Sequence, residues 1–86
     1  MHSERFGRPI VITLHARRRM QERSIDDELL VQLVETGDLR YKDEAHLWIA
    51  RAFADRLDNL VCAAVVIDDA LVVKTVMHHF EWGDRS

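Results

Sequence analysis

The spacing of the apolar residues changes at Gly37, and this change constrains the fold more than any other feature of the 86-residue chain. A short β-branched run at residues 10–13 is followed, from Leu14 to Gly37, by apolar residues that recur every three or four positions, which is typical of helices that bury one face. After Gly37, the period falls to two or the apolar residues form short continuous runs, which is typical of β-strands. The chain is therefore expected to form two helices first and a β-sheet after them.

The first helix is predicted over residues 14–23. Its only apolar stripe is Ala16 and Met20, which are four positions apart and therefore lie on one face. We expect this stripe to pack against the sheet and Met20 to be largely buried.

The second helix is predicted to begin at Ser24 or Asp26, because the side chain of either residue can cap a helix. It is predicted to end at Gly37, since glycine accepts the left-handed conformation that ends many helices. Together the two helices would form a hairpin with one apolar side.

Four strands are predicted after the helices, at residues 39–42, 46–54, 60–67 and 71–79. The third is apolar on both faces, which favours a central position in the sheet. The connections are short, and short connections favour antiparallel neighbours. The predicted fold class is α+β: a helical hairpin followed by a three- to four-stranded antiparallel sheet.

Composition indicates one ordinary globular domain, because 48% of the residues are apolar and 31% are charged. We expect this domain over residues 10–82, after a flexible lead-in at residues 1–9 and before a polar tail at residues 83–86. The longest apolar run has eight residues, too few for a membrane-spanning helix. Cys62 is the only cysteine and cannot form an intrachain disulfide. A cytoplasmic protein without membrane association is expected.

Charge is unevenly distributed, although the net charge is only −3. The first 25 residues hold six arginines and two glutamates, whereas residues 26–44 hold seven acids and two bases. The acidic average argues against a protein that simply coats nucleic acid. The basic first quarter favours an anion site on one side of the molecule.

Three cations of the first helix share one arc, because His15, Arg19 and Arg23 are spaced four residues apart. This arc borders the predicted apolar stripe, where a phosphate would be partly protected from screening by salt. The alternative is structural: Arg18 and Arg19 pair with Glu22, and Arg23 packs its stem on the hairpin.

Lys74 and His78 are four residues apart on the last predicted strand, so simple alternation places them on one face with Val72 and Val76. Either Lys74 is a solubilising residue on an edge strand, or this face forms a cleft that needs a cation. If the first helix begins beside the last strand, His15 and His78 could act as an acid and base pair.

Other reactive residues carry weaker signals. The spacing of the histidines, cysteine and acids matches no metal motif, and the chain has no glycine-rich phosphate loop, so neither a metal nor a cofactor is expected. Cys62 lies in an apolar run, where its pKa should rise and its thiol should be inert. Trp48 and Trp82 are more typical of core or rim positions than of base-stacking surfaces.

The first helix resembles the family called domain of unknown function 4258, which is related to RelE/ParE-like toxins. The matching residues are His15, Ala16, Arg19, Met20, Glu22 and Arg23. The resemblance spans roughly residues 10–80, with one departure: Ser24 stands where the family commonly has glycine. It implies a RelE-like fold, and relatives with that fold include ribonucleases, gyrase poisons and members without known activity.

Two functions follow as hypotheses. The first is a metal-independent ribonuclease of a toxin–antitoxin system, with RNA or the ribosome as target and an antitoxin as partner. In it, Arg19 and Arg23 bind phosphate, His15 and His78 transfer protons, and Lys74 adds a cation. The second is a non-catalytic module whose basic first helix binds an acidic protein or nucleic acid.

Overall fold

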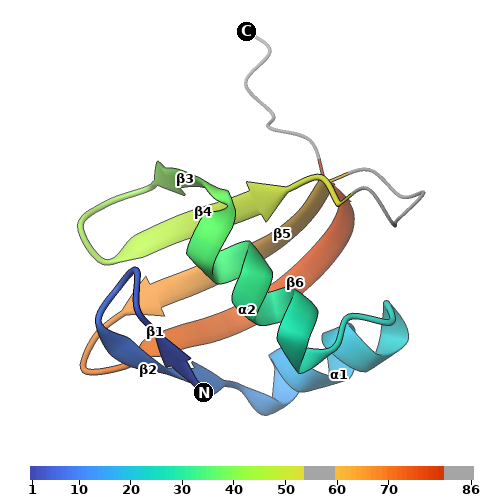
Figure 1. Ribbon diagram of the computed structural model, residues 1–86, viewed down its shortest axis with the longest axis horizontal. Helices are drawn as coiled ribbons and strands as arrows, with labels where there is room; N and C mark the ends of the chain where they lie inside the picture. The colour runs from blue at the N-terminus through green and yellow to red at the C-terminus, as the bar shows by residue number, and fades with distance from the viewer. Residues whose placement is uncertain (54–59, 81–86) are drawn as a thin grey trace, which may run out of the picture.

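The structure, a computed structural model, describes residues 1–53 and 60–80, and the side chains of residues 60 and 78–80 lie outside the described part. Within these residues, six strands form one sheet, and two helices pack on one of its faces (Figure 1). The elements in chain order are β1 (His2–Ser3), β2 (Arg8–Ile12), α1 (Leu14–Glu22), α2 (Asp27–Thr36), β3 (Asp38–Tyr41), β4 (His46–Arg51), β5 (Leu60–Ile67) and β6 (Leu71–Phe80). The order across the sheet is β1-β2-β6-β5-β4-β3.

The predicted fold class is wrong, both in the sheet and in the place of the helices. The sheet is mixed, because β2 runs parallel to β6 with residues 10–12 opposite residues 71–73. The helices follow β2 in the chain instead of preceding the whole sheet. The pairing of β2 with β6 joins segments about 60 residues apart. Contacts so distant in sequence leave no local pattern from which they could be predicted.

The helices pack on the sheet rather than forming a hairpin with each other. α1 packs mainly against β6, and α2 packs mainly against β4 and β5 (Figure 1). Ala16 and Met20 are 0% and 1% exposed and belong to the same core as the buried residues of α2. The predicted burial of this stripe is therefore confirmed.

Short polar side chains cap the start of each helix. Thr13 Oγ1 accepts a hydrogen bond from the backbone N–H of Ala16 (3.1 Å), and Asp26 Oδ1 accepts one from Leu29 (2.9 Å). Each cap satisfies a backbone donor that has no partner within the helix. Of the two predicted caps of the second helix, Asp26 is thus the one in place.

Gly37 ends α2, but not for the predicted reason. Its backbone is extended (φ −72°, ψ 166°) rather than left-handed. A Cβ atom at this position would lie 2.7 Å from Ile49 Cγ2 and 2.7 Å from the carbonyl oxygen of Leu33. Glycine is needed here because the end of α2 lies very close to β4.

β5 is central in the sheet, as predicted. The two faces of the sheet differ in their chemistry. Leu47 and Ile49 of β4 are 1% and 0% exposed and belong to the core beneath the helices. Trp48 lies between them in sequence, so it points to the opposite face. We call this opposite side the second face. Residue 54, the last of the predicted strand, lies outside the described residues.

The first nine residues, assigned to a lead-in by the sequence analysis, include β1 and the start of β2. The turn between these strands includes Gly7, whose φ of 64° lies in the left-handed region that glycine adopts readily. β1 therefore folds back on β2 as an antiparallel pair at the edge of the sheet.

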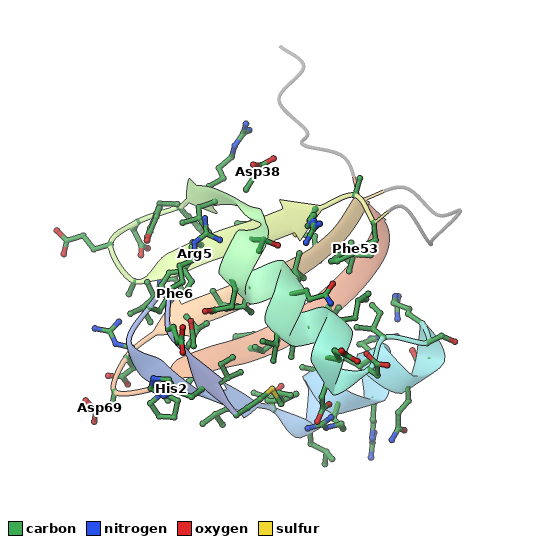
Figure 2. The ribbon with its side chains drawn as sticks, viewed as in Figure 1. His2, Arg5, Phe6, Asp38, Phe53 and Asp69 are labelled. Atoms are coloured by element: carbon green, nitrogen blue, oxygen red, sulfur yellow. The ribbon has the colours of Figure 1, made fainter. Side chains whose placement is uncertain are left out.

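Glu35 of α2 holds the turn between β1 and β2. Its carboxylate accepts hydrogen bonds from the Ser3 hydroxyl and from the backbone N–H groups of Glu4 and Arg5, both at 3.0 Å. Arg5, labelled in Figure 2, also donates to the carbonyl oxygen of Val34 (3.0 Å). Residues at the start of the chain are thereby bonded to the last turn of α2.

Candidate functional site

The predicted phosphate-binding arginines of α1 are close together and share an acidic neighbour. Arg19 and Arg23 both donate to Glu22 Oε1, at 2.9 and 3.3 Å. The hydrogen bond from Arg19 is the main cause that lowers the pKa of Glu22. The ion pair that the structural alternative expects for Arg19 is therefore present. An anion bound by these two arginines would have to displace Glu22 or share its donors.

The start of α1 does lie beside the last strand, as the acid and base pair requires. The backbone N–H of Thr13 donates to the carbonyl oxygen of Val73 (3.2 Å), and Thr13 Oγ1 donates to that of Lys74 (3.3 Å). His15, two residues further on, is exposed. The start of α1 thus meets β6 at Lys74. His78 is four residues further along β6, and its side chain lies outside the described residues.

Lys74 occupies a bulge that breaks the alternation of β6. Ala64 of β5 is opposite Thr75, and Val65 is opposite Val73, so Lys74 is an additional residue between two paired ones. The expectation that Val72 and Val76 share a face is wrong for this reason.

The partners of Val72 and Val76 on β5 show that these two valines point to opposite faces. Val72 lies opposite half-buried Val66, and Val76 lies opposite Ala63, which is fully buried in the core. A second irregularity lies opposite the segment between residues 77 and 80. Counting by twos along β6 therefore cannot assign His78 to a face.

A hollow of about 180 Å³ lies on the sheet around β4, β5 and the bulge of β6. We call it the groove. Its lining consists of Lys42, His46, Leu47, Trp48, Ala64, Val65, Val66 and Lys74. Trp48 lies opposite Ala64, and His46 lies opposite Val66, and cross-strand partners point to the same face. The groove thus combines a mostly apolar floor on the second face with three groups that carry or can accept a positive charge.

Sequence reasoning found only Lys74 among the polar residues of the groove. Lys42 and His46 were missed, and Trp48 was assigned to a core or rim role. One signal was available: His46 and Trp48 are two residues apart on a strand, so they share a face. The convergence with Lys74 depends on the pairing of β4, β5 and β6, which no local pattern specifies.

Asp43 fixes the ring of His46 at the edge of the groove. Its Oδ1 atom lies 2.8 Å from His46 Nδ1, and it accepts the backbone N–H groups of Ala45 (2.9 Å) and His46 (3.0 Å). The hydrogen bond with His46, followed by that from Ala45, lowers the pKa of Asp43, so this carboxyl is ionised at neutral pH. An ionised carboxylate only accepts hydrogen bonds, so Nδ1 of His46 carries the hydrogen. In the neutral ring, the lone pair is then on Nε2.

The remaining reactive groups do not form a second candidate site among the described residues. Burial raises the pKa of Cys62 to about 12, as expected for an inert thiol. Among the side chains that the structure describes, no three histidine, cysteine or acidic groups are placed so that they could hold a metal ion. In the same part of the chain, neither helix is long and apolar enough to cross a membrane. Trp82 lies outside the described residues.

Fold and groove together define a small α+β domain with a six-stranded mixed sheet and a cationic, aromatic hollow on the sheet. The sequence profile of the family described as domain of unknown function 4258 (DUF4258) matches residues 12–78, and the chain belongs to this family. No curated protein and no solved structure matches the chain.

Proposed function

We propose that this chain binds single-stranded RNA in the groove. The observation that carries the proposal is the meeting of Trp48 with Lys42, His46 and Lys74 around one open hollow. An aromatic ring offers a stacking surface to any base, and neighbouring cations attract the phosphates between bases.

The size of the groove favours one unit of a polymer over a whole small molecule. Sites that enclose drug-sized ligands measure about 300 to 1,000 Å³. The groove measures about 180 Å³. It has room for a base or a sugar–phosphate unit, while the rest of a strand would continue over the sheet.

RNA fits the groove better than an acidic peptide does. A peptide that adds to a sheet bonds to the free backbone groups of an edge strand. The groove is centred on β5, whose backbone is paired with β4 on one side and β6 on the other. A ligand in the groove is therefore recognised by side chains. The ring of Trp48 and the separated cations of the groove match the alternation of bases and phosphates along an RNA strand.

The ribonuclease, toxin and antitoxin hypotheses remain proposals beside this one. They rest on the resemblance to RelE/ParE-like toxins, which concerns α1 residues such as His15, Arg19 and Arg23. RNA binding in the groove is compatible with a ribonuclease and with a non-catalytic module. The position of Lys74, bonded through its backbone to the start of α1, would allow a bound strand to contact both surfaces.

The test measures the affinity of the purified chain for a fluorescent single-stranded RNA by anisotropy. Trp48→Ala should weaken binding roughly 5- to 150-fold, as expected for a lost stacking energy of about 1 to 3 kcal/mol. Trp48→Phe keeps an aromatic ring and should retain most of the affinity. Removing both lysines should lower the slope of log affinity against log salt by about 1.4, since each phosphate contact on a single strand contributes about 0.7.

Controls separate the groove from α1. Arg18 is an exposed cation on α1, and Arg18→Ala should leave RNA affinity nearly unchanged. The pair Arg19→Glu and Arg23→Glu tests the basic helix. If this pair abolishes binding while Trp48→Ala has no effect, RNA binds α1 and the groove is excluded. Stronger binding to polyglutamate than to RNA would favour the acidic-partner alternative.

Chemical protection gives an independent measurement. Lys42 and Lys74 are the only lysines in the chain, and both line the groove. Acetylation of lysine followed by mass spectrometry therefore reports on the groove directly. Bound RNA should slow acetylation of both residues, and unchanged rates at saturating RNA would contradict the proposed site.

A further inference from the structure

The groove contains a proton-transfer group held in a defined orientation. His46 lines the groove, and its Nδ1 atom is bonded to Asp43 at 2.8 Å. Asp43 is itself fixed by two backbone N–H groups. A histidine held by a carboxylate in this way has one tautomer and one free nitrogen. This is the arrangement of a general base supported by an orienting residue.

A cation lies on the other flank of the groove. His46 belongs to β4 and Lys74 to β6, with β5 between them. Neighbouring strands are about 4.8 Å apart, so the two backbones are separated by about 10 Å. In phosphoryl transfer the attacking and leaving oxygens lie on opposite sides of phosphorus. A base on one flank and a proton donor on the other meet this requirement.

The bulge at Lys74 is a second feature typical of a reaction site. A regular β6 would pair every residue with β5, but Lys74 is an additional residue in the strand. Bulges are common beside active sites, where they redirect a side chain. Here the bulge lies where Lys74 lines the groove.

We infer that the groove cleaves RNA, with His46 as general base, Asp43 as its positioning residue and Lys74 as general acid. The inference rests on the proposed binding of RNA in the groove. It assigns the proton transfer to His46 instead of the predicted pair His15 and His78.

The reaction needs no co-reactant. His46 Nε2 takes the proton of a ribose 2′-hydroxyl, and the 2′-oxygen forms a bond to the adjacent phosphorus. The bond from phosphorus to the 5′-oxygen of the next nucleotide breaks, and this oxygen takes a proton from the Lys74 ammonium group. The products are a 2′,3′-cyclic phosphate and a 5′-hydroxyl. Proton exchange with water then restores His46 and Lys74.

The experiment uses a DNA oligonucleotide with one ribonucleotide, together with an all-DNA oligonucleotide that has no 2′-hydroxyl. Cleavage is followed by gel and mass spectrometry in the presence of a chelator, and binding of the all-DNA strand is measured separately. The wild-type chain should cut only at the ribonucleotide and leave a cyclic phosphate. His46→Ala should lower the cleavage rate at saturating oligonucleotide about 10²- to 10⁴-fold, and the separate binding measurement distinguishes this loss of catalysis from a loss of affinity.

Asp43→Asn tests the positioning role. Asparagine keeps an oxygen that accepts the two backbone N–H groups, but it removes the negative charge beside the ring. The cleavage rate at saturating oligonucleotide should therefore fall in Asp43→Asn, and Asp43→Glu, which keeps a carboxylate, should recover part of it. A loss in Asp43→Glu equal to that in Asp43→Asn would contradict the positioning role.

Matched histidine variants complete the design. His2→Ala removes an exposed histidine of β1 and should cleave like wild type. His15→Ala should also cleave like wild type, whereas loss of cleavage in His15→Ala or His78→Ala with full activity in His46→Ala would overturn the inference.

Two outcomes separate the inference from the proposed function. A wild-type chain that binds the oligonucleotides but cuts neither overturns the inference and leaves RNA binding intact. A wild-type chain that binds none of them contradicts both. Cutting of the all-DNA strand would overturn the mechanism, because that strand lacks the attacking hydroxyl.

Discussion

Ser24, between the two helices, has a left-handed backbone with φ of 56°. Residues with a Cβ atom lose about 1 to 2 kcal/mol in this conformation. Glycine, which the sequence resemblance implies for this position in related chains, would adopt this conformation without strain. Ser24 is therefore a site of local backbone strain.

Replacing Ser24 by glycine should stabilise the protein. The relief of strain outweighs the additional flexibility of glycine in the unfolded chain, so the free energy of unfolding should rise by about 0.5 to 1 kcal/mol. Urea denaturation measures the change. Arg18→Gly provides the control, because glycine within α1 should lower stability by about 1 kcal/mol. A loss of stability in Ser24→Gly would show that the serine side chain matters more than backbone strain.

Individual residues differ in how far their role could be predicted from the sequence. Ala16 and Met20 could be predicted as core residues because both lie on one short helix. Lys74 could be predicted because a lysine is unusual within an apolar strand. His46 could not, since its significance arises only when Lys74 is brought to the same hollow by pairing across β5.

Individual elements followed the sequence pattern more closely than their arrangement did. β5 occupies the predicted residues, and β6 begins at the predicted Leu71. The faces of β6 could not be predicted, because one additional residue at Lys74 reverses the alternation. β1 was missed because two residues are too few to show a period.

The contact between α2 and the turn of β1 and β2 should depend on pH through Glu35. Partial burial raises the pKa of Glu35, but hydrogen bonds from Ser3, Arg5 and Glu4 outweigh burial, and the pKa lies below its ordinary value. A carboxyl with a lowered pKa in the folded state stabilises that state above its unfolded pKa. This stability is lost as the pH falls through the folded pKa.

Glu35→Gln should therefore destabilise the protein by about 1 to 2 kcal/mol at pH 7. The difference from wild type should shrink towards zero below the folded pKa of Glu35, where the wild-type carboxyl is also neutral. Urea denaturation of both proteins from pH 7 to pH 3 checks this. Glu44→Gln is the control at an exposed site and should have little effect at either pH. A difference that stays constant across this range would exclude the charge of Glu35 as the cause.

The six strands form one sheet, and only part of the strand order could be predicted from the sequence. Antiparallel neighbours β3, β4, β5 and β6 follow the chain and were predictable from short connections. β2 pairs in parallel with β6 on the side away from β5. The reason for this pairing is visible only in the structure, where Ile10 and Leu71 lie opposite each other and are both buried. This long-range packing places Ile10, the first residue of the predicted domain, in the core.

Amide hydrogen exchange should follow this order across the sheet. β5 and β4 have paired neighbours on both sides along much of their length, so their amides should exchange slowest. The terminal strands β1 and β3 should exchange fastest among the strands. Two-dimensional NMR in deuterated buffer measures the rates. Protection in β3 equal to that in β5 would contradict the order of stability expected from the topology.

Parallel pairing of β2 with β6 also has a consequence during protein synthesis. A ribosome that has just completed β2 must add about 60 further residues before the first paired residues of β6 exist. At about 5 to 20 residues per second this takes roughly 3 to 12 seconds. Throughout that interval the β-branched residues of β2 lack their final neighbour and could pair with another nascent chain. Pro9, which has no N–H to donate, lies within β2 and limits such pairing at one position until the sheet closes.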